Sequence, residues 1–302
     1  MGDGYAGIVV RIHLDTGAVA AGAPATVIRK FSSAHLPIRG IARTLGLYGR
    51  EVGFYRDVAG LDGQGAGMPT PGCFYAAYEA DPVAHMLLLE DMDGEIGDHA
   101  AGSTPDQAEQ IVRWLAAFHA RWWEAPELDQ FDWLTVDAAQ VSQRLQVSFD
   151  QALDSALRVC EPHVGAHFAA TLRRLQPRVA SIAMAQAQSP RTLCHGDAHT
   201  ANVFYPTSGD LSPEQRRAAA PRLAKAYVSE LEARGIADYP IIAYERDFPV
   251  CTLYHAVTMT IALGAVDVST DRGQELVSSI VPRVAAMVED LGDISDVLDG
   301  LD

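Results

Sequence analysis

The pattern of apolar residues changes once along this 302-residue chain, near residue 93, and this change constrains the fold more than any other feature. Before it, apolar and polar residues alternate in short runs, which is typical of half-buried strands. After it, apolar residues recur every three to four positions, which is typical of amphipathic helices. We therefore predict an α+β fold with a small β-sheet lobe containing one helix at 1–92 and a larger, mostly helical lobe at 93–302.

The N-terminal lobe is expected to contain four strands, at 8–14, 26–31, 74–78 and 85–89. A turn rich in glycine and alanine joins the first two, so these should form an antiparallel pair. Between the second and third strands, apolar residues at spacings of three and four predict a helix over 41–58.

Two capping boxes mark helix starts in the C-terminal lobe, at Thr104 with Gln107 and at Ser212 with Gln215. Each places a proline at the first helical position, which favours a helix start. Helical patterning covers 137–158 and 163–187, and helices should dominate after Ser212. A short apolar strand is expected at 192–194.

Charge and cysteine usage exclude several classes of function. The chain has 39 acidic and 23 basic side chains, a formal charge of −16, whereas binding nucleic acid needs clustered Lys and Arg. No apolar run approaches the roughly 20 residues of a membrane helix, and we expect no leader segment. The four cysteines lie far apart without Cys-x-x-Cys spacing, which disfavours a disulfide framework or zinc ribbon and indicates a cytoplasmic protein.

Residues 2–9 fit the pattern Gly-x-Gly-x-x-Gly-x-Val, which makes Gly4 and Gly7 candidate phosphate-binding positions. A dinucleotide-binding turn would be followed by a helix. Here an alternating strand follows, which favours a glycine-rich loop laid over nucleotide phosphates. An ordinary hairpin turn fits the same residues.

Lys30 ends the second predicted strand, and Glu51 lies 21 residues later on the predicted helix. In protein kinases, a lysine in a Val-Ala-Ile-Lys strand holds the α- and β-phosphates, and residues 26–30 resemble that strand. A carboxylate on the next helix would pair with this ammonium and orient it. In the alternative interpretation, both residues are ordinary charged side chains at the solvent-exposed surface.

The strongest functional signal lies at 195–203, where Asp197 is followed five residues later by Asn202. This is the spacing of the kinase catalytic loop, in which the Asp accepts the proton of the substrate hydroxyl and the Asn binds magnesium. It makes His195 and Asp197 candidate catalytic residues and Asn202 a candidate metal ligand. In a competing interpretation, the alternating His195, Asp197 and His199 are ligands of a hydrolytic metal site.

A family resemblance rests on four segments of the chain, 50–55, 87–92, 118–123 and 194–205. They resemble the aminoglycoside phosphotransferase and choline kinase group of protein-kinase-like enzymes, most closely its bacterial ecdysteroid-kinase-like relatives. The resemblance implies a bilobal kinase fold, ATP and Mg²⁺ as cofactors, and phosphate transfer to a small-molecule alcohol. It also implies that adenine lies against the backbone of Glu90, Asp91 and Met92. We interpret His119 as a packed residue that braces the catalytic loop.

One part of the family's pattern has no counterpart after Asn202. In the family a hairpin there leads to an Asp that binds the magnesium bridging the β- and γ-phosphates, whereas here a helix starts at Ser212 and Asp210 is the nearby carboxylate. Either the sequence lacks segments of a larger parent, or the protein is a reduced member that binds a nucleotide or ligand without catalysis. Because the metal neutralises charge at the transferring phosphate, restoring the strand that bears this Asp should raise turnover at least ~10³-fold.

The acceptor site is expected in the helical lobe beyond Trp114. Large aromatic residues there are candidates to line it, although aromatics in helical domains are more often core. A bulky apolar alcohol such as a steroid and a cationic amino alcohol are both compatible with such a lining. The candidates are Trp122, Trp123, Trp133, Tyr244 and Tyr254.

Overall fold

The structure is a computed structural model that describes residues 7–15, 23–34, 39–40, 42–43, 46–60, 67–81, 83–92, 95–96, 104–134, 137–195, 204–205 and 211–301. The chain divides into two compact units. The first comprises Met1–Glu95 with Ala125–Thr135, and the second comprises Ile96–Glu124 with Val136–Asp302. The predicted α+β class, with an N-terminal sheet and a larger helical part, is confirmed. We did not predict that residues 125–135, which follow the first part of the second unit in sequence, belong to the first unit.

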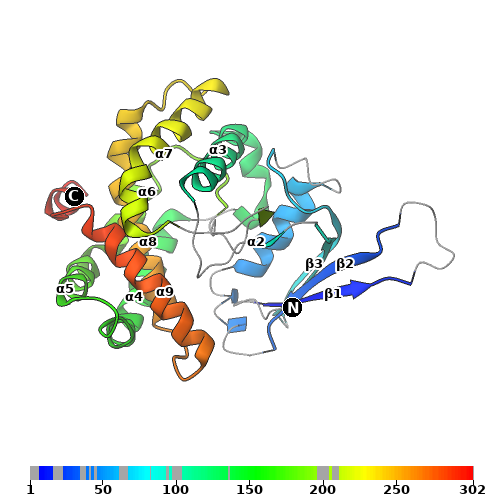
Figure 1. Cartoon of the computed structure of the whole chain (residues 1–302), viewed down its shortest axis with the longest axis horizontal. Helices are drawn as coiled ribbons and strands as arrows, with labels where there is room; N and C mark the ends of the chain where they lie inside the picture. The colour runs from blue at the N-terminus through cyan, green and yellow to red at the C-terminus, as the bar shows by residue number, and fades with distance from the viewer. Residues whose placement is uncertain are drawn as a thin grey trace. The chain divides into compact units, whose positions relative to one another are not determined.

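The first unit is built on a four-stranded antiparallel sheet in the order β1-β2-β4-β3, with β1 and β2 forming the blue pair in Figure 1. Within it, Gly7 lies opposite Ser32, and Lys30 lies between Val9 of β1 and Leu87 of β4. Lys30 therefore projects from an inner strand. All four predicted strands are confirmed, as Gly7–His13 (β1), Thr26–Ser32 (β2), Cys73–Ala80 (β3) and Val83–Glu90 (β4).

Helix α2 (Leu47–Phe54) packs on this sheet and continues as a π-helical turn at Tyr55–Ala59. Together they confirm the predicted helix over its second half. Val52 of α2 packs in a small apolar cluster with Cys73, Leu87 and Leu89 of the sheet. This packing anchors the turn of α2 that carries Glu51.

Residues of the 125–135 segment join the first unit through Trp133. The segment forms two 3₁₀ turns, Pro126–Gln130 and Asp132–Leu134, and the second carries Trp133. Its indole lies against Gly53 of α2, where an added Cβ would fall 2.4 Å from a ring carbon, so only glycine leaves room. The indole Nε1–H also donates to Asp57 Oδ2 at 2.8 Å. Trp133 thus belongs to the first unit and not to the helical lobe in which it was expected to line the acceptor site.

The second unit is largely helical. The predicted helix over 163–187 is broken by a 3₁₀ turn at Gln176–Arg178. A two-residue strand pair, β5 (Glu95–Ile96) with β6 (Phe204–Tyr205), was not predicted. The helices are α3 (Pro105–Arg121), α4 (Ala138–Cys160), α5 (Ala166–Leu175), α6 (Val179–Gln186), α7 (Pro213–Ala233), α8 (Ile241–Leu263), α9 (Asp271–Glu289) and α10 (Ser295–Asp299).

Both predicted capping boxes are present. The side-chain oxygens of Thr104 and Ser212 accept the backbone N–H of Gln107 and Gln215, whose own side chains accept the cap N–H in return. Each box satisfies two backbone donors that the first turn of a helix otherwise leaves unpaired. The boxes therefore set the starts of α3 and α7.

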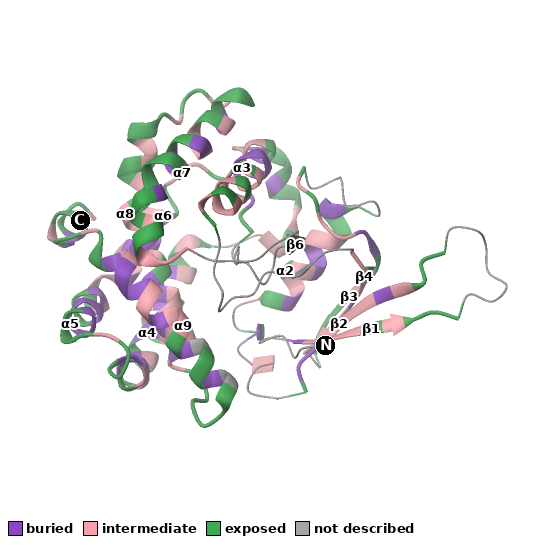
Figure 2. Cartoon of the chain, in the orientation of Figure 1, coloured by how far each residue is buried: buried purple, intermediate pink, exposed green. Residues whose placement is uncertain are grey.

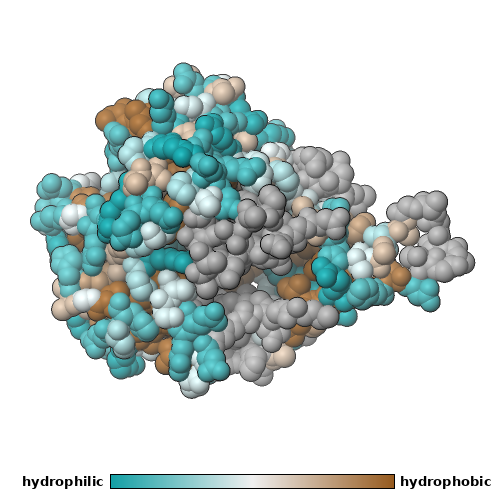
Figure 3. All heavy atoms as spheres, in the orientation of Figure 1, coloured by the Kyte–Doolittle hydropathy of each residue, from teal (hydrophilic) through white to brown (hydrophobic). Residues whose placement is uncertain are grey.

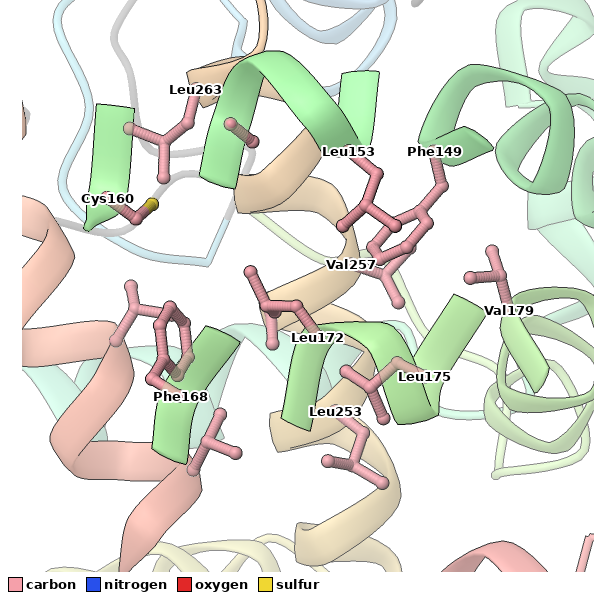
Figure 4. Packing of buried hydrophobic residues seen from close by; sticks show 14 of the residues in the cluster. Phe149, Leu153, Cys160, Phe168, Leu172, Leu175, Val179, Leu253, Val257 and Leu263 are labelled. Atoms are coloured by element: carbon pink, nitrogen blue, oxygen red, sulfur yellow. The ribbon is translucent and has the colours of Figure 1, made fainter. Parts of the chain in front are cut away.

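The core of the helical unit forms where α4, α5, α6, α8 and α9 meet. Figure 2 shows buried residues recurring along α4 and α5 with exposed ones between them, as expected of amphipathic helices. Phe149 and Leu153 of α4 point toward Val257 of α8 (Figure 4). Burying a side chain of this size contributes about 1.5–3 kcal/mol, so this cluster is the main source of stability in the second unit.

On the face shown in Figure 3, hydrophilic residues predominate among those that the structure describes. Within the described residues, no helix has the length and apolar character needed to cross a membrane.

Candidate functional site

The structure brings Lys30 and Glu51 together, as their motif spacing predicts. Lys30 Nζ lies 2.5 Å from Glu51 Oε1, and about a third of each side chain is exposed. An ammonium group has three donors, so pairing with one carboxylate oxygen leaves hydrogen atoms available to an anion. Glu51 therefore holds the Lys30 ammonium in place at a partly exposed position.

His85 of β4 borders this pair and was not predicted. Its side chain is fully buried, its ring stacks on Tyr48 at 4.1 Å, and Nε2 lies 3.8 Å from Glu51 Oε2. Nδ1 lies 3.0 Å from Ser32 Oγ. Burial lowers the pKa of His85 to about 4, so the ring is neutral at physiological pH. The one signal in the sequence was its period-two spacing with Leu87 and Leu89 on the buried face of the strand.

The side chains of Glu90 and Asp91 are engaged within the first unit. The Glu90 carboxylate accepts the backbone N–H of Gly72 at 3.0 Å, and the Glu90 N–H donates to the Gly72 carbonyl at 2.8 Å. Asp91 pairs with Arg11, whose guanidinium holds the pKa of this carboxyl below its usual range. Met92 is half-buried. Any ligand contact at these three positions would therefore involve the backbone more than the two carboxylates.

Gly7 is the first residue of β1 and is buried. An added Cβ would fall 2.9 Å from the Phe31 carbonyl oxygen of β2. This close approach of two backbones explains glycine here, and it differs from the expected role in a phosphate-binding loop. Gly4 lies outside the described residues.

Most of the predicted catalytic loop also lies outside the described residues, including Asp197, His199, Asn202 and Asp210. The structure describes the approach to it, 191–195, which ends at the exposed His195. The strand predicted at 192–194 is wrong, because these residues pair with no strand in the described part of the chain.

The 191–195 segment is attached to the end of α3. The Glu124 N–H donates to the Arg191 carbonyl at 2.7 Å, and the Arg191 N–H donates to Glu124 Oε1. Thr192 Oγ1 donates to the His119 carbonyl at 2.8 Å. These contacts tie the start of the segment to residues 119–124.

Glu124 makes this attachment from a backbone conformation that is uncommon for its type. Its φ of 49° lies in the left-handed region, and it is the one such non-glycine residue among those described. The conformation is unfavourable for a residue with a Cβ. Such strain tends to occur where the surrounding structure requires a specific geometry, here a backbone hydrogen bond six residues before Asp197.

His119 lies beside the same segment. Its Nδ1 shares a 2.7 Å hydrogen bond with the Tyr227 hydroxyl of α7. Burial and the nearby His195 lower the pKa of His119 to about 4, so this ring is also neutral at physiological pH. The ring is packed against α7 and the His119 carbonyl holds Thr192, whereas the bracing of the catalytic loop stays a prediction.

A row of aromatic rings extends from His119 along α7 and α8. Tyr227 lies 5.9 Å from Tyr244, and Tyr244 stacks with Phe248 at 5.6 Å. Trp123 makes an edge contact with Tyr239 at 5.1 Å. Trp123 and Tyr244 were candidates for the acceptor site, whereas the other ring positions were not, because contacts between α3, α7 and α8 have no sequence signature.

The remaining candidates for the acceptor site are structural. Trp122 is buried, and Tyr254 packs against the core of the helical unit. The described residues contain no group of three His, Cys, Asp or Glu side chains able to hold a metal ion. The four cysteines, all described, are free thiols.

The model of a phosphotransferase enzyme family matches residues 38–212, more than half of the chain. The match supports the aminoglycoside phosphotransferase and choline kinase group as a whole and does not single out the ecdysteroid-kinase-like branch. No curated protein matches the chain. The matched stretch contains Glu51, His85, Glu124 and His195.

Proposed function

The chain belongs to this phosphotransferase enzyme family, and we propose that it transfers the γ-phosphate of ATP to a hydroxyl group of a small molecule. The observation that carries the proposal is the ion pair between Lys30 and Glu51. A half-buried lysine on an inner strand, oriented by a helix carboxylate, is the arrangement that kinase-like enzymes use to hold nucleotide phosphates.

In this proposal Lys30 binds the α- and β-phosphates. A lysine side chain has four rotatable bonds and loses conformational entropy when it is held in one position. Glu51 meets this requirement before the nucleotide arrives, because it already fixes the Lys30 ammonium. The backbone of 90–92 would contact the adenine, since the carboxylates of Glu90 and Asp91 are occupied.

Asp197 would accept the proton of the attacking hydroxyl, with His195 beside it. Mg²⁺ would be held by Asn202 and Asp210, whose amide and carboxylate oxygens are the hard ligands that this ion prefers. When bound, the ion would neutralise charge on the transferring phosphate. The contribution of the described residues is to position the catalytic loop, because Glu124 and Thr192 hold the backbone that leads to His195.

The acceptor alcohol would bind along the aromatic row of Tyr227, Tyr244 and Phe248. This placement is supported by the effect of His195, at the start of the catalytic loop, on the pKa of His119. Since His119 bonds Tyr227, the aromatic row begins close to that loop. Aromatic faces bind both apolar rings and alkylammonium groups. Steroid-type alcohols and amino alcohols are therefore the two classes to test.

The decisive experiment uses the fact that Lys30 and Lys225 are the only lysines in the chain. ATP binding with Mg²⁺ is measured by calorimetry, and phosphate transfer is screened over both alcohol classes. We expect Lys30→Met to lower kcat/KM by about 10²–10³-fold, the usual effect of removing a group that stabilises developing charge. Lys225→Met, at an exposed position on α7, is the matched control and should leave activity unchanged.

Two outcomes would contradict the proposal. One is the absence of ATP binding by the unaltered protein, and the other is an equal effect of the two lysine substitutions. ATP binding without transfer to any alcohol of either class would limit the function to nucleotide binding.

A further inference from the structure

The imidazole of His85 is enclosed on several sides. Its ring stacks on Tyr48 of α2 with an interplanar angle of 16°, and its Cε1 lies 3.7 Å from the position of a Cβ on Gly7. Nδ1 faces Ser32 Oγ of β2, and Nε2 faces Glu51 Oε2 of α2. Three elements of the first unit therefore fix the orientation of this ring.

Ser32 favours one of the two neutral tautomers of the His85 ring. Its Oγ already accepts the backbone N–H of His85 at 2.8 Å, so its own hydrogen is available for donation. The acceptor within reach is Nδ1 at 3.0 Å, and a nitrogen that accepts a hydrogen bond in a neutral imidazole leaves the proton on the other nitrogen. Donation from Ser32 Oγ to Nδ1 therefore favours the Nε2–H tautomer.

Glu51 favours the same tautomer. In the opposite tautomer the lone pair of Nε2 would face a carboxylate oxygen 3.8 Å away, which is repulsive. With the proton on Nε2, the N–H dipole attracts that oxygen. Nε2 makes no hydrogen bond within the part of the chain that the structure describes, and 3.8 Å is too long for one. The attraction is electrostatic, and burial of Nε2 keeps water away from the imidazole side of the contact.

We infer that His85 is a positioning residue for the Lys30–Glu51 pair. It acts as a neutral imidazole whose Nε2–H attracts Glu51 Oε2 and so keeps Oε1 directed at Lys30. The contacts form a closed path from Ser32 through His85 and Glu51 to Lys30, with both ends on β2. The inference rests on the proposed function, because orienting Lys30 matters only if Lys30 binds phosphate.

A neutral donor suits this position better than a charged one. A lysine or arginine in place of His85 would compete with Lys30 for the Glu51 carboxylate, and a carboxylate would repel it. A neutral N–H orients Glu51 without changing the net charge of the pair.

The first test does not depend on ATP. A two-bond ¹H–¹⁵N correlation spectrum of the full chain at neutral pH reports the histidine tautomers, and the resonance lost in His85→Gln identifies His85. We expect the proton on Nε2. Ser32→Ala removes the donor to Nδ1 and should shift the population toward the other tautomer. A proton on Nδ1 in the unaltered protein would overturn the inference.

The second test measures the availability of Lys30. The full chain is treated with a small acylating reagent, and labelling of Lys30 is compared with that of Lys225 as an internal reference. His85→Phe retains the stacked ring and removes the donor, so labelling of Lys30 should increase a few-fold. His85→Gln retains an N–H donor and should change labelling less.

Leu89→Val is the matched control, because Leu89 is buried on the same strand and packs in the apolar cluster with Val52, Cys73 and Leu87. It should lower stability without changing the labelling ratio. Equal labelling in His85→Phe and Leu89→Val would overturn the inference. If His85→Phe does not fold, Ser32→Ala replaces it and should increase labelling in the same direction.

The final test separates this inference from the proposed function. In His85→Phe we expect kcat/KM for ATP to fall about tenfold, the effect of losing one interaction with a charged group, with His85→Gln recovering most of it. A protein that binds no ATP but shows the Nε2–H tautomer and the labelling change would contradict the function and not the positioning of Glu51. A tenfold loss without either change would contradict the positioning.

Discussion

The two units place their candidate functional side chains beside apolar cores of different size. The sheet unit keeps charged residues in pairs at half-exposed positions around a small apolar cluster, as Lys30 and Glu51 show. The helical unit surrounds a larger core and keeps His119 neutral through burial and a hydrogen bond to Tyr227. A site for a polyanion needs accessible positive charge, whereas a site that recognises an alcohol needs apolar surface.

This difference has a consequence for stability. Partly exposed ion pairs contribute little, about 0–1 kcal/mol each. The sheet unit therefore depends on strand pairing and on the cluster around Leu87. The helical unit depends on side chains such as Phe149 and Leu172, which are fully buried.

The largest expected effect comes from deleting core side chains. Leu172→Ala in the helical unit should lower the free energy of unfolding by about 4 kcal/mol, and Leu87→Ala in the sheet by about 3 kcal/mol, within the range of such cavities. Both side chains are fully buried. The larger core provides more packed neighbours around the cavity that Leu172 leaves.

Denaturant titration can separate these effects. Far-ultraviolet circular dichroism follows the helical unit, and the part of the fluorescence lost in Trp133→Phe follows the sheet unit. Each substitution should lower the denaturant midpoint of the unit that contains it more than the midpoint of the other unit. Equal shifts of both transitions would show that the two units unfold together.

The next effect concerns acid. His119 has a pKa of about 4 when folded and 6.5 as its ordinary value, and His85 is shifted the same way. The unfolded chain therefore binds more protons, so stability is full above pH 6.5 and is lost as the pH falls toward 4. Each histidine should contribute a slope of about 1.4 kcal/mol per pH unit in that window.

Glutamine substitutions test this slope one unit at a time. His119→Gln should flatten the pH dependence of the helical transition, and His85→Gln that of the sheet transition. Unfolding free energies at several pH values between 4 and 7 provide the measurement. A slope unchanged by both substitutions would show that neither buried ring must gain a proton on unfolding.

A smaller effect is expected at Glu124. Glu124→Ala removes the carboxylate that accepts the Arg191 N–H and keeps a Cβ at φ 49°, which should cost about 1–2 kcal/mol. Glu124→Gly removes the same carboxylate and relieves the left-handed strain, so its cost should be lower by about 1 kcal/mol. Thermal unfolding and kcat are the readouts. A glycine variant no more stable than the alanine variant would contradict the strain.

The smallest effects are expected at exposed ion pairs. Arg11→Gln breaks the pair with Asp91 in the sheet unit, and Arg222→Gln breaks the contacts of α7 with Asp106 and Glu109 of α3. Each should cost less than about 1 kcal/mol, the usual limit for exposed pairs. A loss above 2 kcal/mol in chemical denaturation would show that the pair organises a larger network.

Local features could be predicted from the sequence. The strands follow from alternation, and the starts of α3 and α7 follow from capping boxes whose partners are three residues apart. The Lys30–Glu51 pair was predicted because both residues belong to a spaced motif. In each case the interacting residues are close in sequence or carry a recognisable pattern.

Features that depend on distant contacts could not be predicted in this way. His85 was overlooked because its partners Ser32 and Glu51 lie 53 and 34 residues away in sequence, on other elements. The apolar run at 192–194 was mistaken for a strand because three residues do not reveal that Glu124 holds the preceding Arg191 and that the His119 carbonyl accepts from Thr192.

The contact between Trp133 and Gly53 determines when the sheet unit can form during synthesis. Its four strands have all been made by residue 90, but the indole that fills the notch in α2 follows 43 residues later, after all of α3. A nascent chain that has exposed only the strands would have an open notch, and Asp57, already paired with Arg56, would lack the indole N–H. The sheet unit is therefore completed on the ribosome only after the first helix of its neighbour has emerged, and a fragment cut after β4 would omit its last packing residue.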